Sequence, residues 1–329
     1  MILLNPGPTN THNSVKDVQT ANTDICHRTS EFIRSYDKLK EELVRVFDPP
    51  KQSKWKVSIL CGSGTAALEA MITSLVPQKI TTIVAGKYGE RALRIMDLNS
   101  ISYDPLYVDH IGELQPDKSV EFLYFVENET TTGESFPLSR MVELYPNATF
   151  YIDSTSAFGA TEYRKYSDQI GALSFCSNKC LQSPAGLGIV IYPQEAPLFN
   201  RSSLYFDLSL YQDQLPFTVP PQLVSALLES LRLRTDSETT FNTKRDNLIK
   251  DFKTIGINCI NRNPSNSVIG FVHPTMSYNT LMTFLKKKDI IIYSGIPGVE
   301  NSFRVSTMSV DFNKKYDYIK GAFHDSCLC

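Results

Sequence analysis

Three short segments of the sequence carry residue types that could act together in chemistry. Cys61-Gly62-Ser63-Gly64-Thr65 follows an apolar run and opens a helical pattern, Asp153 ends a second apolar run, and Ser177-Asn178-Lys179 follows a third. Backbone amides at a helix start, with hydroxyls on both sides of a glycine, form a cup for a phosphate group. A carboxylate can pair with a ring nitrogen, and a lysine beside small polar residues at a strand end suits Schiff-base chemistry with an aldehyde.

Each segment also has a purely structural interpretation. The glycine segment could be a tight turn without a ligand, Asp153 could cap a following helix, and Lys179 could be a solvated surface charge. The spacing Gly62-x-Gly64-x-x-Ala67 also fits a loose dinucleotide fingerprint, but residues 81–89 (TTIVAGKYG) lack the acid expected on the next strand. A phosphate monoester therefore fits the cup better than a dinucleotide does.

The combination of the three segments favours one cofactor. A phosphate cup, an acid and a lysine at the ends of neighbouring strands are what pyridoxal 5'-phosphate (PLP) requires. Ligands in open α/β sheets bind beyond the carboxyl ends of the strands, where all three are expected. Tyr88, in Gly86-Lys87-Tyr88-Gly89, follows a further apolar run and could cover the cofactor ring. The sequence therefore predicts a PLP site.

Short apolar runs alternate with amphipathic stretches along most of the chain, which is typical of an α/β domain with a largely parallel sheet. The runs are rich in β-branched and aromatic residues and are bounded by Gly, Asn, Asp or Ser, so they predict strands. Six of them are assigned to one large sheet: 56–60, 82–85, 122–126, 149–152, 173–176 and 188–192. The distance along the chain from Asp153 to Lys179 fits one strand, helix, strand unit.

Helical periodicity lies between these runs. Apolar residues between Ala67 and Leu75 recur at spacings of three and four, and residues 221–234 repeat the pattern with proline in the first turn and arginines late. From about residue 236 a charged helical stretch leads to shorter strands near 267–272 and 290–293. We therefore expect a large domain at residues 1–235, with residues 1–15 near the active site, and a smaller α+β domain at 236–329.

Composition excludes several classes of protein. The 329 residues include 33 Lys and Arg against 35 Asp and Glu, so the net charge of -2 offers no excess of positive charge for a nucleic acid. We expect no membrane span, since no apolar stretch is long enough, and without a recognisable signal we expect the cytoplasm. The seven cysteines are odd in number and scattered, which indicates reduced thiols and, with no second ligand pair beside Cys176 and Cys180, no metal site.

Several longer motifs together resemble one family. The chain is similar to the class V aminotransferases of PLP fold type I, and the ETTTG and SNKCLQ segments are most similar to 2-aminoethylphosphonate:pyruvate transaminases. The resemblance implies an α/β fold whose large domain has a mostly parallel seven-stranded sheet. The motifs that carry it are LLNPGPT (3–9), GSGTAALEA (62–70), GKYGERAL (86–93), ETTTGESFP (129–137), YIDSTSAFGA (151–160) and SNKCLQSPAGLGIVIY (177–192).

The resemblance implies roles for the residues of the predicted cofactor site. Lys179 would hold the cofactor covalently and then move a proton between the substrate carbon and the cofactor carbon. Asp153 would pair with the pyridinium nitrogen, and Tyr88 would stack on the ring. The remaining cofactor-binding residues are implied as follows: Ser63, Gly64 and Thr65 at the phosphate, Thr131 and Thr132 near the ring oxygen, and Asn178 as the polar amide before the lysine.

Substrate and subunit contacts are implied as well. Arg304 would bind the substrate's carboxylate or phosphonate, since a guanidinium fork suits both anions, and Arg28 is a second candidate for the phosphonate. Pro8 and Thr9 are expected on the substrate side. Thr218 matches a threonine that reaches the cofactor phosphate of the other subunit, so a homodimer with shared active sites is implied.

The predicted reaction is a ping-pong transamination. The amino donor 2-aminoethylphosphonate would give phosphonoacetaldehyde, and pyruvate would then accept the amine as alanine. Alanine:glyoxylate or serine:pyruvate specificity uses the same groups and is the first alternative. A cysteine desulfurase is disfavoured, because that branch usually has histidine where this chain has Asn178. A non-catalytic dinucleotide-binding α/β protein is the alternative from another class.

Overall fold

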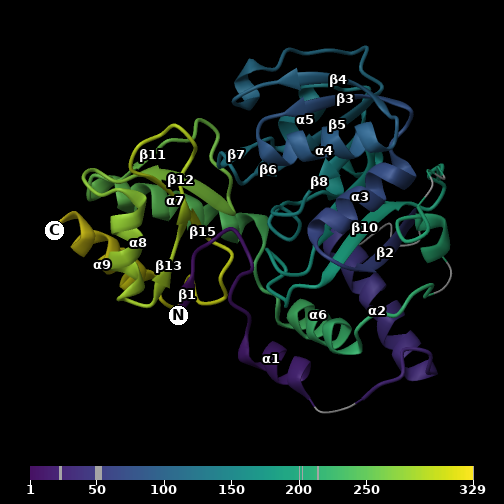
Figure 1. Ribbon diagram of the computed structural model, residues 1–329, viewed down its shortest axis with the longest axis horizontal. Helices are drawn as coiled ribbons and strands as arrows, with labels where there is room; N and C mark the ends of the chain where they lie inside the picture. The colour runs from purple at the N-terminus through teal and green to yellow at the C-terminus, as the bar shows by residue number, and fades with distance from the viewer. Residues whose placement is uncertain (22–23, 49–53, 200, 202, 213–214, 329) are drawn as a thin grey trace.

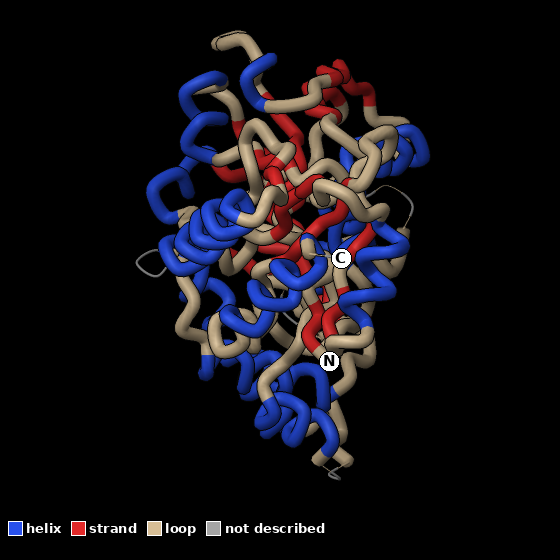
Figure 2. Tube along the Cα trace, turned by 90° about the vertical axis from the view of Figure 1, so that its left-hand side faces the viewer, coloured by secondary structure: helices blue, strands red, loops and turns tan. Residues whose placement is uncertain are grey.

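The computed structural model describes residues 1–21, 24–48, 54–199, 201, 203–212 and 215–328. These residues form two lobes, each with its own sheet (Figure 1). Both chain ends lie on the lobe that faces the viewer in Figure 2. Within the described part of the chain, none of the helices is both long and apolar enough to cross a membrane.

The larger lobe contains the predicted seven-stranded sheet. Its order is β2-β10-β9-β8-β5-β3-β4, and only β10 runs against the others, so the predicted fold class is confirmed. The strands are β2 (Trp55–Cys61), β3 (Lys79–Val84), β4 (Ser102–Tyr107), β5 (Phe122–Val126), β8 (Thr149–Asp153), β9 (Ile170–Cys176) and β10 (Leu187–Pro193). The six predicted runs all overlap strands of this sheet. The seventh strand, β4, escaped prediction because Pro105 and an exposed, polar edge position hide its pattern.

Helices cover both faces of this sheet, which explains why its strands are apolar runs rather than alternating ones. One core is formed against α3 (Gly64–Leu75) and α4 (Lys87–Leu98), and we call this side the α3 face. The opposite core, on the α2 face, is formed against α2 (Ser30–Phe47), α5 (Leu138–Leu144) and α6 (Pro221–Leu233). Neighbouring residues of one strand alternate between the two, as Ile59 and Leu60 of β2 do.

The smaller lobe is built on the antiparallel sheet β11-β12-β15-β14. The predicted strand at 290–293 is divided into two: β13 pairs with β1 near the N-terminus and β14 pairs with β15. The first residues of the chain therefore lie in this lobe. Its elements are β1 (Ile2–Leu3), α7 (Glu238–Thr254), β11 (Asn258–Cys259), β12 (Val268–Val272), α8 (Tyr278–Lys286), β13 (Ile290–Ile291), β14 (Tyr293–Ser294), β15 (Ser302–Ser306) and α9 (Tyr316–Cys327).

The remaining elements connect these parts. Helix α1 (Asn13–Thr20) packs against α6, and a short hairpin of β6 (Asn128–Glu129) and β7 (Glu134–Ser135) follows β5. The predicted strand, helix, strand unit between Asp153 and Lys179 is wrong in one respect. The connection from β8 to β9 contains a 3-10 helix, η3 (Arg164–Gln169), and no α-helix. Residues 154–160 form tight turns instead, and one of them requires Gly159 at φ +96°.

Candidate active site

The carboxyl ends of β2, β8 and β9 bring the three predicted segments to one edge of the sheet. Asp153 lies opposite Ser174 in the β8–β9 register, and β10 aligns the ends of β2 and β9 on either side of it. The start of α3 contacts both neighbours, since a β-carbon at Gly64 would lie 3.0 Å from Thr155 Cγ2 and 3.5 Å from Cys176 Sγ. Glycine at position 64 thus allows the helix start to approach the acid-bearing strand.

Asp153 is a buried carboxylate, 4 % exposed, on the α3 face. Its Oδ1 accepts a hydrogen bond from the Thr155 backbone N–H at 2.9 Å. Burial raises the pKa of Asp153, while the hydrogen bonds from Thr155 and the positive charges of Lys179 and Arg91 act in the opposite direction. A cationic partner in the site would hold this carboxylate in its charged form.

Lys179 is half-buried and lies against the N-terminal segment. Within the described residues its Nζ makes neither a hydrogen bond nor an ion pair. Its side chain passes Gly7 so closely that a β-carbon there would lie 3.1 Å from Lys179 Cε, and Gly7 has φ +135°. The Thr9 N–H donates to the Asn178 carbonyl at 3.4 Å, so residues 7–9 run directly beside the lysine. Pro8 is exposed and Thr9 is buried in this segment.

The phosphate cup is formed by the start of α3. Ser63 is the N-cap residue and its side chain makes no capping bond. In the described part of the chain, the backbone N–H groups of Ser63 and Thr65 have no partner. Arg91 Nη1 donates to Thr65 Oγ1 at 2.9 Å and so brings a positive charge to the cup. Unpaired amides at a helix N-terminus beside an arginine are suited to an anion.

Tyr88 stands in the first turn of α4, next to a buried acid that sequence reasoning missed. The backbone N–H groups of Tyr88 and Gly89 donate to Glu129 Oε2 at 3.1 and 3.4 Å. The Arg91 guanidinium lies 4.8 Å from the centre of the Tyr88 ring. Glu129 thus fixes the helix start that carries the ring, as a carboxylate at a helix N-terminus does. Its position within the ETTTG motif was the available signal.

Thr131 and Thr132 form the turn that Glu129 begins. Thr131 Oγ1 donates to Glu129 Oε1 at 2.5 Å, and Thr132 Oγ1 donates to the Glu129 carbonyl at 3.2 Å. A β-carbon at Gly86 would lie 2.6 Å from Thr131 Oγ1, so this turn packs against the segment that carries Tyr88. Both hydroxyls are therefore held within the turn.

Arg304 joins the smaller lobe to the same turn. It lies on β15, is 6 % exposed, and its Nη1 donates to the Thr130 carbonyl. Its Nε donates to the Ser294 carbonyl at 2.7 Å, and its guanidinium lies 4.8 Å from the centre of the Tyr293 ring. The arginine is thus placed beside the residues that neighbour Tyr88 rather than on an outer surface.

Two predicted residues, Arg28 and Thr218, lie on the surface of the single chain. Arg28 is exposed, and its Nη1 donates to the Leu215 carbonyl at 2.7 Å. Thr218 is exposed in the segment that leads from Leu215 to α6. Arg28 and Thr218 therefore lie on neighbouring segments. Phe217 of this region packs against Tyr205, whose hydroxyl donates to the Cys61 carbonyl at 2.9 Å.

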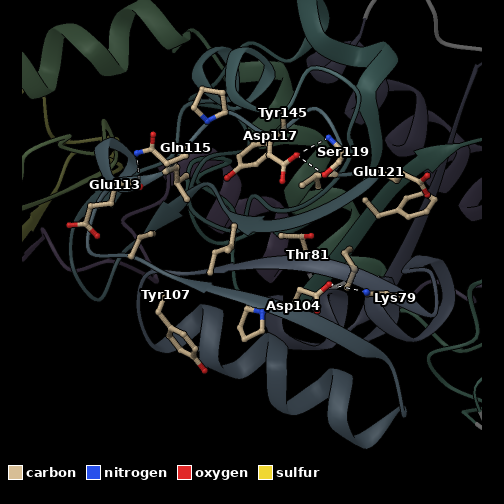
Figure 3. Close-up of a pocket in the computed structure, with 18 of the residues that line it drawn as sticks. Lys79, Thr81, Asp104, Tyr107, Glu113, Gln115, Asp117, Ser119, Glu121 and Tyr145 are labelled. Carbon is tan, nitrogen blue, oxygen red and sulfur yellow. Dashed lines mark hydrogen bonds and ion pairs between the residues drawn. The ribbon is translucent and has the colours of Figure 1, made fainter.

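A cavity of about 1000 Å³ lies beside the edge strand β4, at the other end of the strand order from β2, and is separate from the predicted site. Its lining comes from β3, β4 and the connection to β5, and it includes the ion pair of Lys79 and Asp104 and the turn of Asp117 with Ser119 (Figure 3). The connection contains only the short 3-10 helix η2 (Ile111–Glu113), which leaves this edge open.

No family model matches the chain. Curated relatives do match: the chain is 27% identical to a protein of Bacillus mycoides (strain KBAB4) named 2-aminoethylphosphonate–pyruvate transaminase, over 97% of this chain and 96% of the relative. A Bacillus cereus protein of the same name is also 27% identical, over 98% of each chain. The resemblance inferred from the motifs is confirmed.

Solved structures agree on the fold. An aspartate aminotransferase of subgroup IV from Thermus thermophilus superposes with a TM-score of 0.86 at 23% identity, covering 99% of each chain. An alanine–glyoxylate aminotransferase from Nostoc sp. superposes with a TM-score of 0.84 at 18% identity, covering 100% of this chain and 95% of that one. The chain therefore has the fold of the aminotransferases and is similar to proteins named 2-aminoethylphosphonate–pyruvate transaminase over nearly its whole length.

The residues of this site fit PLP on their own geometry. The helix amides at Ser63 and Thr65 are open to a phosphate, Asp153 is a buried acid without a full ion pair, and Lys179 Nζ has no hydrogen-bonding partner in the described residues. The glycine at position 64 lets the helix start pack directly against Thr155 and Cys176, next to the acid. The donor set therefore matches a phosphate, a ring nitrogen and an aldehyde.

Proposed function

We propose that the transaminase moves the amino group of 2-aminoethylphosphonate to pyruvate, giving phosphonoacetaldehyde and alanine in a ping-pong cycle. The observation that carries this proposal is the likeness to curated relatives of that name over 96% or more of their length. A buried Arg304 beside the ETTTG turn supports it, because an anion-binding group is needed for both substrates.

The chain's own residues would divide the work as follows. PLP, when bound, supplies an aldehyde that reacts with amines and a ring that accepts electrons from the substrate carbon. Lys179 Nζ would hold the aldehyde group and would later carry a proton to or from the substrate carbon. Asp153 would keep the ring nitrogen protonated, and Tyr88 would stack on the ring. The start of α3, residues 63–65, binds the phosphate, with Thr131, Thr132 and Asn178 around the ring.

Arg304 has donors to spare for a substrate anion. A guanidinium carries five N–H groups. Three of them are directed to the Thr130 carbonyl and to the carbonyl and hydroxyl of Ser294. The two that are left would bind the phosphonate of the donor and, in the second half of the cycle, the carboxylate of pyruvate. Pro8 and Thr9, beside Lys179, would border the same space.

The proposal includes a homodimer in the cytoplasm. Thr218 and Arg28 are exposed in the single chain, and both would act in the active site of the partner subunit. Thr218 would contact the cofactor phosphate there and Arg28 the phosphonate. Residues 1–235 would form the large domain, apart from the first residues, whose strand β1 pairs with β13 of the smaller lobe, and residues 236–329 would form the small domain that closes over the substrate.

A panel of half-reactions tests the specificity. The purified enzyme with PLP is mixed in turn with 2-aminoethylphosphonate, alanine and serine, and loss of the visible absorbance of the lysine-bound cofactor is followed. We expect 2-aminoethylphosphonate and alanine to react, since they are donor and product. If serine and alanine react and 2-aminoethylphosphonate does not, the phosphonate assignment fails and serine:pyruvate or alanine:glyoxylate specificity replaces it.

A further inference from the structure

A second buried acid, Glu127, lies next to Asp153 and takes no part in the mechanism above. It follows β5 directly, is 1 % exposed, and its backbone N–H donates to the Asp153 carbonyl at 3.1 Å. In the β5–β8 register the preceding Val126 pairs with Asp153. The backbone that carries the cofactor-binding acid is therefore hydrogen-bonded to the backbone of Glu127.

The Glu127 carboxylate binds the residue that follows Asp153. Ser154 Oγ donates to Glu127 Oε2 at 2.9 Å, and Tyr163 Oη donates to the same oxygen at 2.6 Å. The two hydroxyl oxygens are 3.0 Å apart, so the three side chains form a closed triangle. We call Glu127, Ser154 and Tyr163 the acid triangle. Tyr163 belongs to the core on the α2 face, so the triangle lies across the sheet from Asp153 and α3.

The acid triangle holds the Asp153 segment from both sides of its peptide bond. Glu127 binds the Asp153 carbonyl through its backbone and the Ser154 hydroxyl through its carboxylate. The Ser154 N–H also donates to the Ser174 carbonyl at 2.9 Å. Because side chains alternate between the two faces of a strand, fixing this peptide directs the Asp153 side chain to the α3 face, where the cofactor site lies.

Glu127 also lines a cavity of about 380 Å³ that is bounded by residues of both lobes. The cavity gives the buried carboxylate a route for proton exchange. Burial raises the pKa of Glu127 to about 7, opposed by the hydroxyls of Tyr163, Thr161 and Ser154 and assisted by the charge of Glu238. Six titratable groups from the β8–β9 connection and α7 face this carboxylate or line the cavity with it: Glu162, Tyr163, Lys165, Tyr166, Glu238 and Arg245.

We propose that Glu127 is a positioning residue for Asp153 and that it acts through Ser154. Protonation of Glu127 then weakens the binding of the cofactor ring by the protein. The ionised carboxylate accepts both hydroxyl bonds and fixes the Asp153 peptide. The neutral acid is a weaker acceptor, so the Ser154 hydroxyl and the peptide before it gain freedom. The inference rests on the proposed cofactor role of Asp153.

The test measures binding of pyridoxamine 5'-phosphate, which makes no covalent bond to Lys179, by isothermal titration calorimetry between pH 6 and 8.5. Titration of the ligand itself cancels in a ratio of dissociation constants. We expect the ratio of Glu127→Gln to wild type to rise from about one at pH 6 to about five at pH 8.5, with its midpoint near pH 7. A ratio that is constant with pH overturns the proposal.

Two further variants test whether Glu127 acts on Asp153 through Ser154. Ser154→Ala removes the link between Glu127 and the Asp153 peptide, so its ratio to wild type should rise with pH as that of Glu127→Gln does. Tyr163→Phe removes a hydroxyl that stabilises the charged carboxylate, so the tightening of ligand binding that accompanies ionisation of Glu127 should occur at higher pH in this variant than in wild type. If Ser154→Ala retains the wild-type pH dependence, Glu127 does not act through Ser154 and the proposal fails.

Asp48→Asn is the matched control. Asp48 is 0 % exposed, and its Oδ2 accepts from Trp55 Nε1 at 3.3 Å, at the end of β2 away from the phosphate cup. This variant should bind pyridoxamine 5'-phosphate with the wild-type pH dependence, and a change as large as that of Glu127→Gln would show a general effect of a lost buried acid. A wild-type protein that does not bind the ligand at all refutes the proposed function, whereas binding without the pH-dependent ratio refutes only the role of Glu127.

Discussion

The two buried acids at the end of β8 and β5 differ in how completely the protein satisfies them. On the α3 face, Asp153 accepts a hydrogen bond from the Thr155 backbone N–H, and the amine of Lys179 and the amides of Ser63 and Thr65 have no hydrogen-bonding partner among the described residues. On the α2 face, Glu127 accepts from two hydroxyls that also contact each other. Buried polar groups normally find hydrogen-bonding partners, so groups that lack one indicate a ligand site, and we call the α3 face the open side. Groups that bond to one another indicate a supporting role, and we call the α2 face the closed side.

Replacement of Lys179 should give the largest effect on the open side. Lys179→Ala removes the amine that holds the cofactor and moves the proton, so kcat should fall about 10⁴-fold. The measurement is the rate of alanine formation from 2-aminoethylphosphonate and pyruvate. Lys79→Ala, at an exposed lysine paired with Asp104 on the far edge of the sheet, should keep the wild-type rate. A Lys179→Ala enzyme within tenfold of wild type would contradict the site.

Loss of the Asp153 charge should rank second. Asp153→Asn keeps the shape of the side chain but no longer stabilises a protonated ring nitrogen, so kcat should fall about 10²-fold to 10³-fold. The same assay with saturating PLP measures it. Asp104→Asn at the far edge is the control and should have no effect. Equal losses in the two variants would mean that Asp153 acts only through the general fold.

Arg304 should affect substrate binding more than cofactor binding. Arg304→Lys removes the fork that binds paired oxygens, so KM for 2-aminoethylphosphonate should rise about 10²-fold while PLP stays bound. Steady-state kinetics and the cofactor absorbance give the two readouts. Arg140→Lys, at an exposed arginine paired with Glu143, is the control. Loss of PLP from Arg304→Lys would assign the arginine to the cofactor instead.

Replacement of Glu127, on the closed side, should change the stability of the folded protein rather than kcat. The folded pKa of Glu127 is about 7, above its ordinary value of 4.5, so the folded state binds the proton more tightly than the unfolded state does. The protonated Glu127 therefore contributes about 3 kcal/mol to the free energy of unfolding. This contribution is fully present below about pH 4.5 and is lost as the pH rises through 7. In urea unfolding, wild type should lose this stability relative to Glu127→Gln between pH 5 and 8. A constant difference between the two proteins would contradict the raised pKa.

The open side of the site was largely predictable from sequence, and the closed side was not. Asp153, Lys179 and the glycine segment each follow an apolar run, and parallel strands place the residues after them at one edge of the sheet. Nothing local marks Glu127, whose partner Tyr163 comes 36 residues later in the chain. Glu129 was visible within its motif, but its bond to the start of α4 depends on residues 40 and 41 positions away.

The sequence by itself determined the kind of fold, the strands of the large sheet apart from β4, the cofactor class and the residues at the strand ends, because hydrophobic periodicity and turn chemistry are local. Only the tertiary structure decided that Arg304 contacts the Thr130 carbonyl, that Gly7 packs directly against the Lys179 side chain, and that the β8–β9 connection has no α-helix. These features depend on which distant segments exclude water from one another. Burial, which gives Asp153 and Glu127 their raised pKa values, exists only once those segments have met.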